Sequence, residues 1–378
     1  MREIPFAAAR TWLFDRALPF WAAHGVDETH GGFHEALTLA GAPLDVGFKR
    51  VRVIARQTYV FAHAALMGWD GPARALAERG GAELVARAWS PTRGHFVRTL
   101  TTAGAARDET PDLYDHAFVL FAFGWLHAAT GAQHWLDWAL RTVDAIETHF
   151  AASEGFAHVA PDDGARLQNP HMHLLEAALV CLEHTRHPRF EALTQRIVAL
   201  FAGRLFDPGT GTLAEYFDAD WARAAGERGR IVEPGHHFEW AWILGQARRI
   251  ARLDQSAAAL RLVAFAERFG CDEASGATFN SVRDDGAPLD RGSRTWPNTE
   301  RIKGAIAAFE LGGVDPRPAL AAAGNALLDR YLTPDGGWID SYDAAVQPTA
   351  TTMPASTFYH VALALAELLR VEAAVRAL

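Results

Sequence analysis

The chain has 378 residues, of which 49% are hydrophobic, and its formal net charge is −9. This charge provides no basic surface for nucleic acid or anionic lipid, so neither is expected as a partner. Only two cysteines occur, Cys181 and Cys271, which excludes a disulfide framework and a four-cysteine zinc site and suits a reduced, cytoplasmic setting. Charged residues interrupt the apolar segment 1–21, so neither a signal peptide nor a membrane span is predicted there.

A glycine followed within three residues by an aromatic or large apolar residue recurs along the chain. These glycines are 56 to 65 residues apart, at Gly32, Gly94, Gly155, Gly211, Gly276 and Gly337. A nearly constant period of this length indicates a repeat architecture. Chain length alone favours two or three domains. The even repeat instead predicts that residues 1–378 form one closed domain.

Helices are predicted in pairs between these glycines. A first helix is expected over about residues 4–24, and apolar residues at three- and four-residue spacing predict another over residues 50–61. The first members of the six pairs are predicted to begin near Phe48, Asp112, Pro170, Gly235, Pro297 and Ala355. The second members are predicted at residues 72–89, 135–150, 190–205, 255–269 and 316–331.

The two members of each pair differ in polarity. First helices are rich in apolar and aromatic residues, as in residues 118–125, and are expected to form a buried inner ring. Second helices carry charges on one face and are expected outside. Six pairs predict an all-α fold, an (α/α)6 barrel, with short β-strands in the loops at one mouth. The segment 4–24 supplies the twelfth helix, which favours a closed barrel over the alternative of an open solenoid.

Each first helix carries an ionisable residue near its start, 18 to 25 residues after the repeat glycine. These residues are Arg56, His116, His173, His236, Glu300 and His360. In a closed barrel they would form a ring of titratable groups around one mouth, which packing alone does not require. Two other readings stay open, His116 as a hydrogen-bonded core histidine and Glu300 as a structural salt-bridge partner of Arg301, Lys303 or another basic group.

The residue types of this ring favour proton transfer. Glu239 lies three residues after His236, on the same helical face, where a carboxylate can orient the imidazole or bind hydroxyl groups. Histidines are common zinc ligands, but no His-Glu-x-x-His helix or cysteine pair accompanies them, so no metal and no cofactor is predicted. The nucleophile elbow of serine hydrolases and the phosphate-binding glycine loop are also missing from the sequence. The tryptophans Trp296 and Trp338 complete a cleft suited to a polyhydroxylated ligand.

Together these segments resemble the N-acylglucosamine 2-epimerase superfamily, and in particular its mannose isomerase branch. The resemblance is carried by Ala55-Arg56-Gln57, Tyr114-Asp115-His116-Ala117-Phe118, Asn169-Pro170-His171-Met172-His173, Gly235-His236-His237-Phe238-Glu239-Trp240, Trp296-Pro297-Asn298-Thr299-Glu300 and Phe358-Tyr359-His360. It extends over roughly residues 12–369. The resemblance implies an (α/α)6 barrel and catalysis without a metal ion.

The resemblance also implies roles for single residues. His360 looks like the histidine that takes the proton from C2 of an open-chain sugar. His236 looks like the histidine that assists ring opening and, in epimerases, acts as the opposing acid or base. Arg56 looks like the arginine that polarises O1 and O2 of the enediolate. The residues expected to bind substrate are Tyr114, His116, Asn169, His173, Glu239, Trp296, Glu300 and Trp338.

The expected activity is cofactor-independent interconversion of D-mannose and D-fructose, with D-lyxose and D-xylulose as a further pair. Residues 353–360 resemble the mannose isomerase branch, and the insert 207–233 is expected to cap the cleft and leave little room for a second sugar ring. Three arginines in this insert, Arg223, Arg228 and Arg230, raise the question of a phosphate or sulfonate on C6.

Alternatives remain at this point. The first is a sugar 2-epimerase of the glucose/mannose or N-acylglucosamine type, because both histidines occur in either subclass. A glycoside hydrolase or lyase on the same barrel would need two carboxylates flanking the bond that is cleaved. A purely binding protein is the non-enzymatic alternative. The expected partner is a monosaccharide, and the protein is expected to be a monomer or a homodimer.

Overall fold

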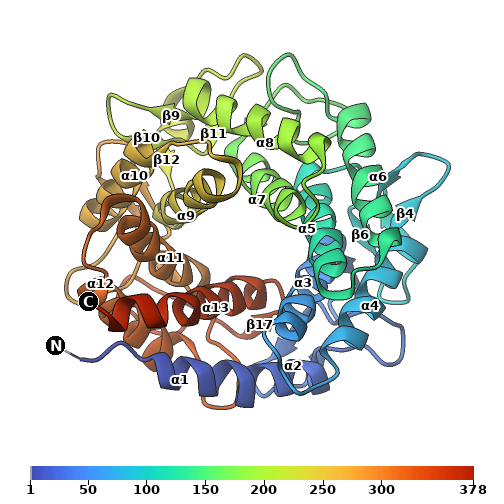
Figure 1. The fold of residues 1–378 in the computed structure, drawn as a ribbon, viewed down its shortest axis with the longest axis horizontal. Helices are drawn as coiled ribbons and strands as arrows, with labels where there is room; N and C mark the ends of the chain where they lie inside the picture. The colour runs from blue at the N-terminus through green and yellow to red at the C-terminus, as the bar shows by residue number, and fades with distance from the viewer. Residues whose placement is uncertain (1) are drawn as a thin grey trace.

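A ring of six inner helices surrounds the axis of the molecule (Figure 1). The computed structural model describes residues 2–378. The inner helices are α3 (Val51–Leu66), α5 (Leu113–Thr130), α7 (Gln168–Thr185), α9 (Pro234–Ala251), α11 (Thr295–Gly312) and α13 (Thr357–Arg376). Their starts lie close to the predicted ones, which confirms the inner ring.

A second ring of helices encloses the first (Figure 1). Its members are α1 and α2 (Phe6–Thr11 and Leu18–His24, joined by a π-helical turn), α4 (Ala73–Glu83), α6 (Gln133–His149), α8 (Pro188–Leu200), α10 (Ser256–Phe269) and α12 (Arg317–Ala326). Helices α4, α8 and α12 each continue into a further π-helical turn, Leu84–Ala88, Phe201–Leu205 and Leu327–Tyr331. The predicted (α/α)6 architecture is therefore confirmed. No helix among residues 2–378 is long and apolar enough to cross a membrane.

The polarity of the two rings follows the sequence pattern. On inner helix α5, Phe118, Phe121 and Phe123 are buried in the main hydrophobic core. On outer helix α4, Arg74 and Glu78 are exposed. An amphipathic outer helix packed on an apolar inner helix removes both apolar faces from water, which is the main stabilising contribution to such a fold.

The barrel is closed between its first and last units. Outer helix α1 packs beside α13, as predicted for the twelfth helix. The amide of Gln57 on α3 donates a hydrogen bond of 2.7 Å to the carbonyl of Ala355, at the start of α13. Strand β1 (Ala36–Thr38) pairs antiparallel with β17 (Thr352–Pro354). These contacts join residues from opposite ends of the chain and exclude an open solenoid.

Short strands lie at the mouth where the inner helices begin, and several of them connect neighbouring units. They are β1, β2 (Pro43–Leu44), β3 (Lys49–Arg50), β4 (Trp89–Ser90), β5 (His95–Phe96), β6 (Thr99–Leu100), β7 (Ala106–Asp108), β8 (Arg166–Leu167), β9 (Phe206–Asp207), β10 (Thr212–Leu213), β11 (Tyr216–Phe217), β12 (Ile231–Val232), β13 (Ser281–Arg283), β14 (Pro288–Asp290), β15 (Ser293–Arg294), β16 (Ser341–Tyr342) and β17. The strand before an inner helix pairs with the strand after the next repeat glycine, as β3 does with β6, β8 with β11, β12 with β13 and β15 with β16. The predicted strands at one mouth are thus the joints of the ring.

Each joint also satisfies a free backbone donor at the start of an inner helix. The first N–H groups of a helix have no partner within it. Here a carbonyl from the next unit accepts one of them in the pairs Val51–Arg98, Leu113–His158, Gln168–Glu215 and Thr295–Asp340, and in the pair Ala355–Glu35 it accepts an N–H two residues before α13, at 2.9 to 3.3 Å. The remaining inner helix begins with Pro234, which has no N–H group to satisfy. The joints therefore fix the height of the inner helices relative to one another.

A side chain near the start of four inner helices binds the turn that contains the repeat glycine. These turns need a residue with positive φ, which glycine supplies, although in the last unit it is Gly336 and not the predicted Gly337. The side chains of His116, His171, His237 and Asn298 accept hydrogen bonds from the backbone N–H groups of Phe96, Phe156, Leu213 and Thr278, at 3.0 to 3.1 Å. We call these four side chains the turn-binding residues.

His116 illustrates the chemistry of this position. Its Nδ1 donates to the carbonyl of Asp112 at 2.8 Å, and its Nε2 accepts the N–H of Phe96 at 3.1 Å. Burial lowers the pKa of His116 to about 3, so the imidazole is neutral and can accept at Nε2. The open question about His116 is therefore answered in favour of a hydrogen-bonded core histidine.

We expect His116→Ala to lower the free energy of unfolding by roughly 1–3 kcal/mol, because the N–H of Phe96 loses its partner while it stays buried. His116→Asn should recover part of this loss, since Asn298 performs the same role in the fifth unit. Urea denaturation at neutral pH measures both effects. His134→Ala, on an exposed histidine of α6, is the control. A His116→Ala protein as stable as this control would contradict the structural role.

The same histidine should make stability depend on pH. Its pKa is about 3 in the folded protein and 6.5 in the reference state, so the unfolded chain binds the extra proton first. Stability from the neutral imidazole is complete above pH 6.5 and decreases as the pH falls toward 3, by about 1.4 kcal/mol per pH unit. His116→Asn has no imidazole to protonate at this position, so its free energy of unfolding should fall with pH less steeply than that of the wild type, by about 1.4 kcal/mol per pH unit less. Urea titrations between pH 7 and 5 measure this difference.

Candidate active site

A cavity of about 360 Å³ opens at the mouth where the inner helices begin. Eight residues predicted for the site line it: Arg56, Tyr114, Asn169, His173, His236, Glu239, Trp296 and His360. They come from all six inner helices. The structure therefore brings together most of the residues that the repeat and the resemblance selected.

His360 on α13 is bound to a buried carboxylate behind it. Its Nδ1 lies 2.8 Å from Glu300 Oε1 and 3.9 Å from Glu239 Oε1. Burial, together with the positive charges of Arg56 and Lys303, lowers the pKa of His360 well below its usual value. The imidazole is therefore neutral, with Nδ1 donating to Glu300 and with Nε2 left as a free base.

Beneath His360 lies a fully buried group of opposite charges. The ammonium of Lys303 is 2.6 Å from Glu300 Oε2 and 3.7 Å from Glu239 Oε1. Burial raises the pKa of Glu300, and so does the neighbouring carboxylate of Glu239. Burial alone would lower the pKa of Lys303, but the carboxylates around it, Glu300 first, raise it. An ionised Lys303 thus compensates charges that would otherwise be costly so far from water.

A third carboxylate, Glu176 on α7, extends this group toward His173. The hydroxyl of Tyr359 donates to Glu176 at 2.6 Å, and Nδ1 of His173 lies 3.1 Å from the same carboxylate. Burial lowers the pKa of His173 to about 3, so a neutral His173 donates from Nδ1 and presents Nε2 as an acceptor. Such a side chain suits a substrate hydroxyl.

His236 on α9 has the opposite electrostatic environment. Burial would lower its pKa, but the carboxylates of Glu215 and Glu233, 3.0 and 3.9 Å from its Nδ1, raise the pKa to about 9. Gln168 holds this arrangement from behind, because its amide donates to Glu215 Oε2 at 2.8 Å. His236 is therefore protonated at neutral pH, whereas His360 is not.

Arg56 on α3 is held by aromatic rings and has no carboxylate partner among residues 2–378. Its guanidinium lies 4.1 Å from the ring centroid of Phe118 and 5.1 Å from that of Tyr359. One nitrogen donates to the hydroxyl of Tyr114 at 2.7 Å, another donates to the carbonyl of Ser356 at 3.4 Å, and Nε has no partner in the described chain. Its charge is thus available to an anionic group in the cavity.

Asn169 and Trp296 complete the binding surface. The side-chain oxygen of Asn169 is buried at the cavity and finds no hydrogen-bond donor within residues 2–378. Buried polar atoms are normally satisfied, so this oxygen suits a ligand hydroxyl. The ring of Trp296 lies 4.9 Å from that of His236 and 5.4 Å from that of His360, between centroids. A flat apolar face therefore lies between the two histidines.

Three predicted substrate-binding residues do not line the cavity. His116 does not reach the cavity because it binds the turn that contains Gly94. In three other units the inward side of the helix is occupied two residues after the turn-binding residue, by His173, Glu239 and Glu300. Phe118 occupies that place after His116. Trp338 is buried in the core, stacked on Trp21 with centroids 4.7 Å apart. Glu300 contacts the cavity only through His360.

Several residues of the site were not identified from the sequence. They are Arg50, Gln168, Glu176, Glu215, Glu233, Arg294, Asp340, Ser356, Thr357 and Tyr359. The repeat contained a signal for two of them. A polar residue lies three or four positions after the left-handed glycine of every unit, namely Glu35, Arg98, His158, Glu215, Asn280 and Asp340. Comparison of these positions would have selected Glu215 and Asp340.

Carboxylates and histidines gather more densely than the sequence suggested. Three groups have potential ligand atoms within 4.8 Å of one another: His173 with Glu176 and Glu239, Glu215 with Glu233 and His236, and Glu239 with Glu300 and His360. In the last group the ammonium of Lys303 already lies against both carboxylates. Catalysis without a metal stays a prediction.

Known proteins resemble this chain in sequence and in fold. The family described as N-acylglucosamine 2-epimerase (GlcNAc 2-epimerase) matches residues 31–364. A mannose-6-phosphate isomerase of Rhizobium meliloti (strain 1021) is 37% identical over 370 residues, covering 94% of this chain and 95% of that protein. A D-mannose isomerase of Thermobifida fusca is 30% identical over 322 residues, covering 79% of this chain and 78% of that protein.

Solved structures share the fold. A sugar epimerase from a ruminal bacterium superimposes with a TM-score of 0.88 at 17% identity, covering 97% of this chain and 99% of that one. A D-mannose isomerase superimposes with a TM-score of 0.85 at 21% identity, covering 97% and 98% of the two chains. The family match covers most of the chain and agrees with the sequence relatives. The protein is thus an enzyme of the N-acylglucosamine 2-epimerase family, whose members are sugar isomerases and epimerases.

Proposed function

We propose that this enzyme interconverts D-mannose and D-fructose by proton transfer through an enediolate, with D-lyxose and D-xylulose as a second pair. The observation that carries the proposal is that one cavity holds two histidines whose pKa values are displaced in opposite directions. A pair of titratable groups separated in this way provides a base and an acid at the same pH. Two relatives at 30% identity or more are named for isomerisation of mannose or its phosphate.

His360 is assigned as the base. A neutral imidazole with a free Nε2 can take the proton from C2, next to the carbonyl of the open-chain sugar. The imidazolium that forms then donates from Nδ1 to Glu300, whose carboxylate stabilises the new charge. If the same nitrogen returns the proton to C1 while the hydroxyl proton on O2 is lost and O1 is protonated, the aldose becomes a ketose. Glu300 therefore acts as a positioning residue for His360.

His236 is assigned as the acid. Because its pKa is about 9, it carries a proton that it can donate to the ring oxygen as the sugar opens. Arg56 is assigned to the enediolate oxygen, since a cation with no carboxylate partner in residues 2–378 stabilises negative charge as it develops. His173, Glu239 and Asn169 are assigned to the sugar hydroxyls, and Tyr114 and Trp296 to the walls of the cavity.

A 2-epimerase is the second candidate, and one observation favours it. His236 and His360 belong to different helices, α9 and α13, with the ring of Trp296 next to both. Proton removal by one histidine and delivery by the other from the opposite face would invert C2. The chemistry up to the enediolate is the same in both reactions, so the products decide between them.

Incubation of D-mannose with the enzyme in D₂O is therefore the primary test. We expect fructose to accumulate to equilibrium, with deuterium at C1 where the transferred proton exchanges with solvent. Chromatography and NMR of the products measure both. Glucose formed from mannose without fructose would overturn the proposed reaction and support the epimerase.

His360→Asn should lower kcat by roughly 10²–10⁴-fold, because the general base is lost. Glu300→Gln should lower kcat less, since an amide can still accept from Nδ1 but cannot stabilise the imidazolium charge. Far-ultraviolet circular dichroism checks the fold of each variant. His134→Asn on outer helix α6 is the matched control and should retain full activity. Full activity in a folded His360→Asn protein would exclude His360 as the base.

The pKa of His236 gives a separate prediction. Activity should fall as the pH rises through about 9, where His236 loses its proton. In Glu215→Gln the nearest negative charge is lost while the burial remains, so the pKa of His236 should fall below about 9 and the alkaline decline should begin at lower pH. NMR titration of histidine signals and pH–rate profiles measure both values.

Glu227→Gln, on an exposed carboxylate that pairs with Arg283, is the control for this titration. It should leave the histidine titration and the pH–rate profile unchanged. An alkaline limb that is identical in wild type and Glu215→Gln would remove His236 from the role of acid.

A further inference from the structure

A second hollow, of about 340 Å³, adjoins the sugar cavity, and arginines form most of its wall. It is lined by Phe48, Arg50, Arg52, Arg98, Thr99, Arg107 and Asp108, and we call it the arginine hollow. Arg50 lines both the arginine hollow and the sugar cavity, so the two spaces are neighbours that share this side chain as a wall. Nothing in the proposed isomerisation uses this group of charges.

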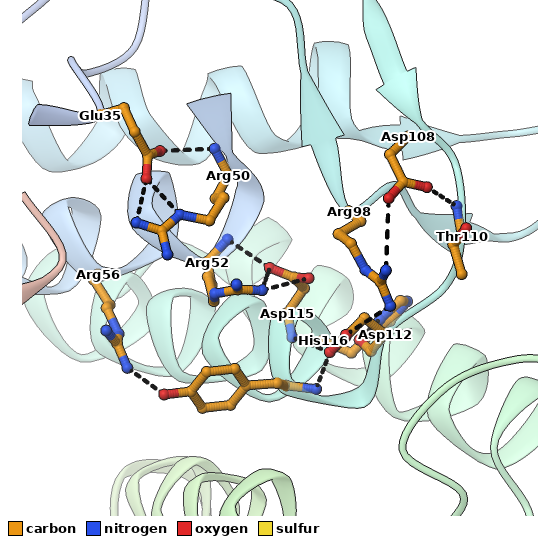
Figure 2. Close-up of polar contacts among 11 residues, drawn as sticks. Glu35, Arg50, Arg52, Arg56, Arg98, Asp108, Thr110, Asp112, Asp115 and His116 are labelled. Carbon is orange, nitrogen blue, oxygen red and sulfur yellow. Dashed lines mark hydrogen bonds and ion pairs between the residues drawn. The ribbon is translucent and has the colours of Figure 1, made fainter. Parts of the chain in front are cut away.

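The carboxylates that pair with these arginines lie behind them (Figure 2). Glu35 binds Arg50, Asp115 binds Arg52, and Asp112 binds Arg98. The side chains of Glu35, Asp115 and Asp112 are 5%, 0% and 16% exposed, whereas those of Arg50, Arg52 and Arg98 are 30%, 21% and 31% exposed. The guanidinium groups are therefore held in place from the protein side and present positive charge on the accessible side.

Hydrogen-bond donors remain unused on these side chains. Arg52 places one nitrogen, Nη1, on both oxygens of Asp115, at 3.2 and 3.3 Å. Nε of Arg98 is buried and has no acceptor among the described residues. Arg107 forms no ion pair within residues 2–378 and lies over the ring of Phe48, 5.0 Å from its centroid. Each guanidinium carries five N–H groups, so the hollow offers several free donors to an oxyanion.

One carboxylate, Asp108, stands at the hollow itself. Its side chain is 38% exposed and lies 3.6 Å from Arg98, and it accepts the backbone N–H of Thr110 at 3.0 Å. Four arginines thus share the accessible side with a single carboxylate, in a chain whose overall charge is −9. Arg50, Arg52 and Arg98 are ion-paired, so Arg107 is the arginine of the hollow whose charge no carboxylate of residues 2–378 balances, and anion binding explains such a charge at a concave surface.

The arginines that the sequence suggested for this role are engaged elsewhere. Arg223 pairs with Asp207 and Asp284, at 3.0 and 2.7 Å. Arg230 pairs with Asp284 and Asp285, at 3.0 and 2.6 Å, and Arg228 lies over the ring of Tyr216. These three side chains belong to neither the lining of the sugar cavity nor that of the arginine hollow.

We propose that the arginine hollow binds a phosphate group, or another oxyanion of similar charge, carried by the sugar substrate at the end remote from its carbonyl. The inference rests on the proposed aldose–ketose isomerisation and names its substrate class, a sugar phosphate. The two spaces lie close together, since Arg50 lines both and the ring of Tyr114 lies 5.3 Å from Arg52 of the hollow and 5.5 Å from Arg56 of the cavity. The proposal places the carbonyl end of the sugar in the cavity and its anionic end at the hollow.

The test compares kcat/KM for D-mannose 6-phosphate with that for D-mannose, and the ratio of the two values is the readout. In wild type we expect a ratio above about ten. Arg107→Gln should lower the ratio about tenfold, as expected when one charge-assisted hydrogen bond is lost. Asp108→Asn should raise it, because the one carboxylate at the hollow is neutralised while its bond from Thr110 can persist. Arg141→Gln, on the exposed face of outer helix α6, is the matched control and should leave the ratio at the wild-type value.

Inorganic phosphate separates a substrate phosphate from a free anion. If the proposal is correct, phosphate inhibits competitively against mannose 6-phosphate, and Arg107→Gln weakens this inhibition. Phosphate that binds by calorimetry in a wild-type enzyme with no preference for the phosphorylated sugar would overturn the proposal in favour of a free anion. A ratio that Arg107→Gln and Asp108→Asn leave unchanged would also overturn it.

Failure of the proposed isomerisation has a different signature. In that case neither sugar yields a ketose, whatever the variant. Calorimetry with inorganic phosphate still tests the hollow in that case. Phosphate binding that is lost in Arg107→Gln and retained in Arg141→Gln supports an oxyanion site. Equal binding in all proteins, or no binding in any, contradicts it.

Discussion

The hydrogen bond between the start of one inner helix and a carbonyl of the next unit is the interaction on which the site depends. It occurs at five of the six joints, and the sixth inner helix begins with proline and needs none. Because the bond is made to the backbone, it fixes the height of each inner helix and leaves its side chains free to vary. Corresponding positions of the inner helices can therefore hold an arginine, a phenylalanine, a histidine or a carboxylate while the ring of helices stays closed.

Electrostatics within the barrel oppose stability and serve the proposed chemistry. Lys303, Glu300 and Glu239 are fully buried, and removing three charges from water costs several kcal/mol for each ion before their attraction is counted. The closed rings of apolar helices offset this cost. The arrangement gives the two histidines of the cavity different protonation states. Burial, together with the charges of Arg56 and Lys303, lowers the pKa of His360 and keeps it neutral, while the carboxylates near His236 raise its pKa and keep it charged.

Much of the fold followed from the sequence because the repeat is a strong signal. The glycines, the helix pairs and the closing N-terminal helix were all predictable from period and polarity. The site was less so. Residues 18 to 25 positions after the repeat glycine span more than one helical turn of 3.6 residues, so spacing alone cannot separate the side chain that faces the cavity from one that faces the turn. That is why His116 was placed in the ring, although Phe118 occupies the inward position.

Other residues were missed because their role depends on partners from distant units. Lys303 was predictable as a partner of Glu300, three residues before it, but only the approach of α9 to α11 places Glu239 beside it as well. Trp338 shows the opposite error. Its aromatic character suggested a sugar-binding wall, but Trp21 from the N-terminal helix covers it by stacking. No property of residues 330–340 alone indicates that contact.

Corresponding positions of the repeat also carry charges of opposite sign on two sides of the mouth. The residue four positions after Gly94 is Arg98, which faces the arginine hollow, and the residue four positions after Gly211 is Glu215, which holds the proton on His236. Positive charge therefore collects where the first two units meet, and negative charge collects around α9. A substrate with an anionic end would be drawn to the first side and repelled by the second. Its orientation would then be set before any hydroxyl is bound, since charge acts over longer distances than hydrogen bonds do.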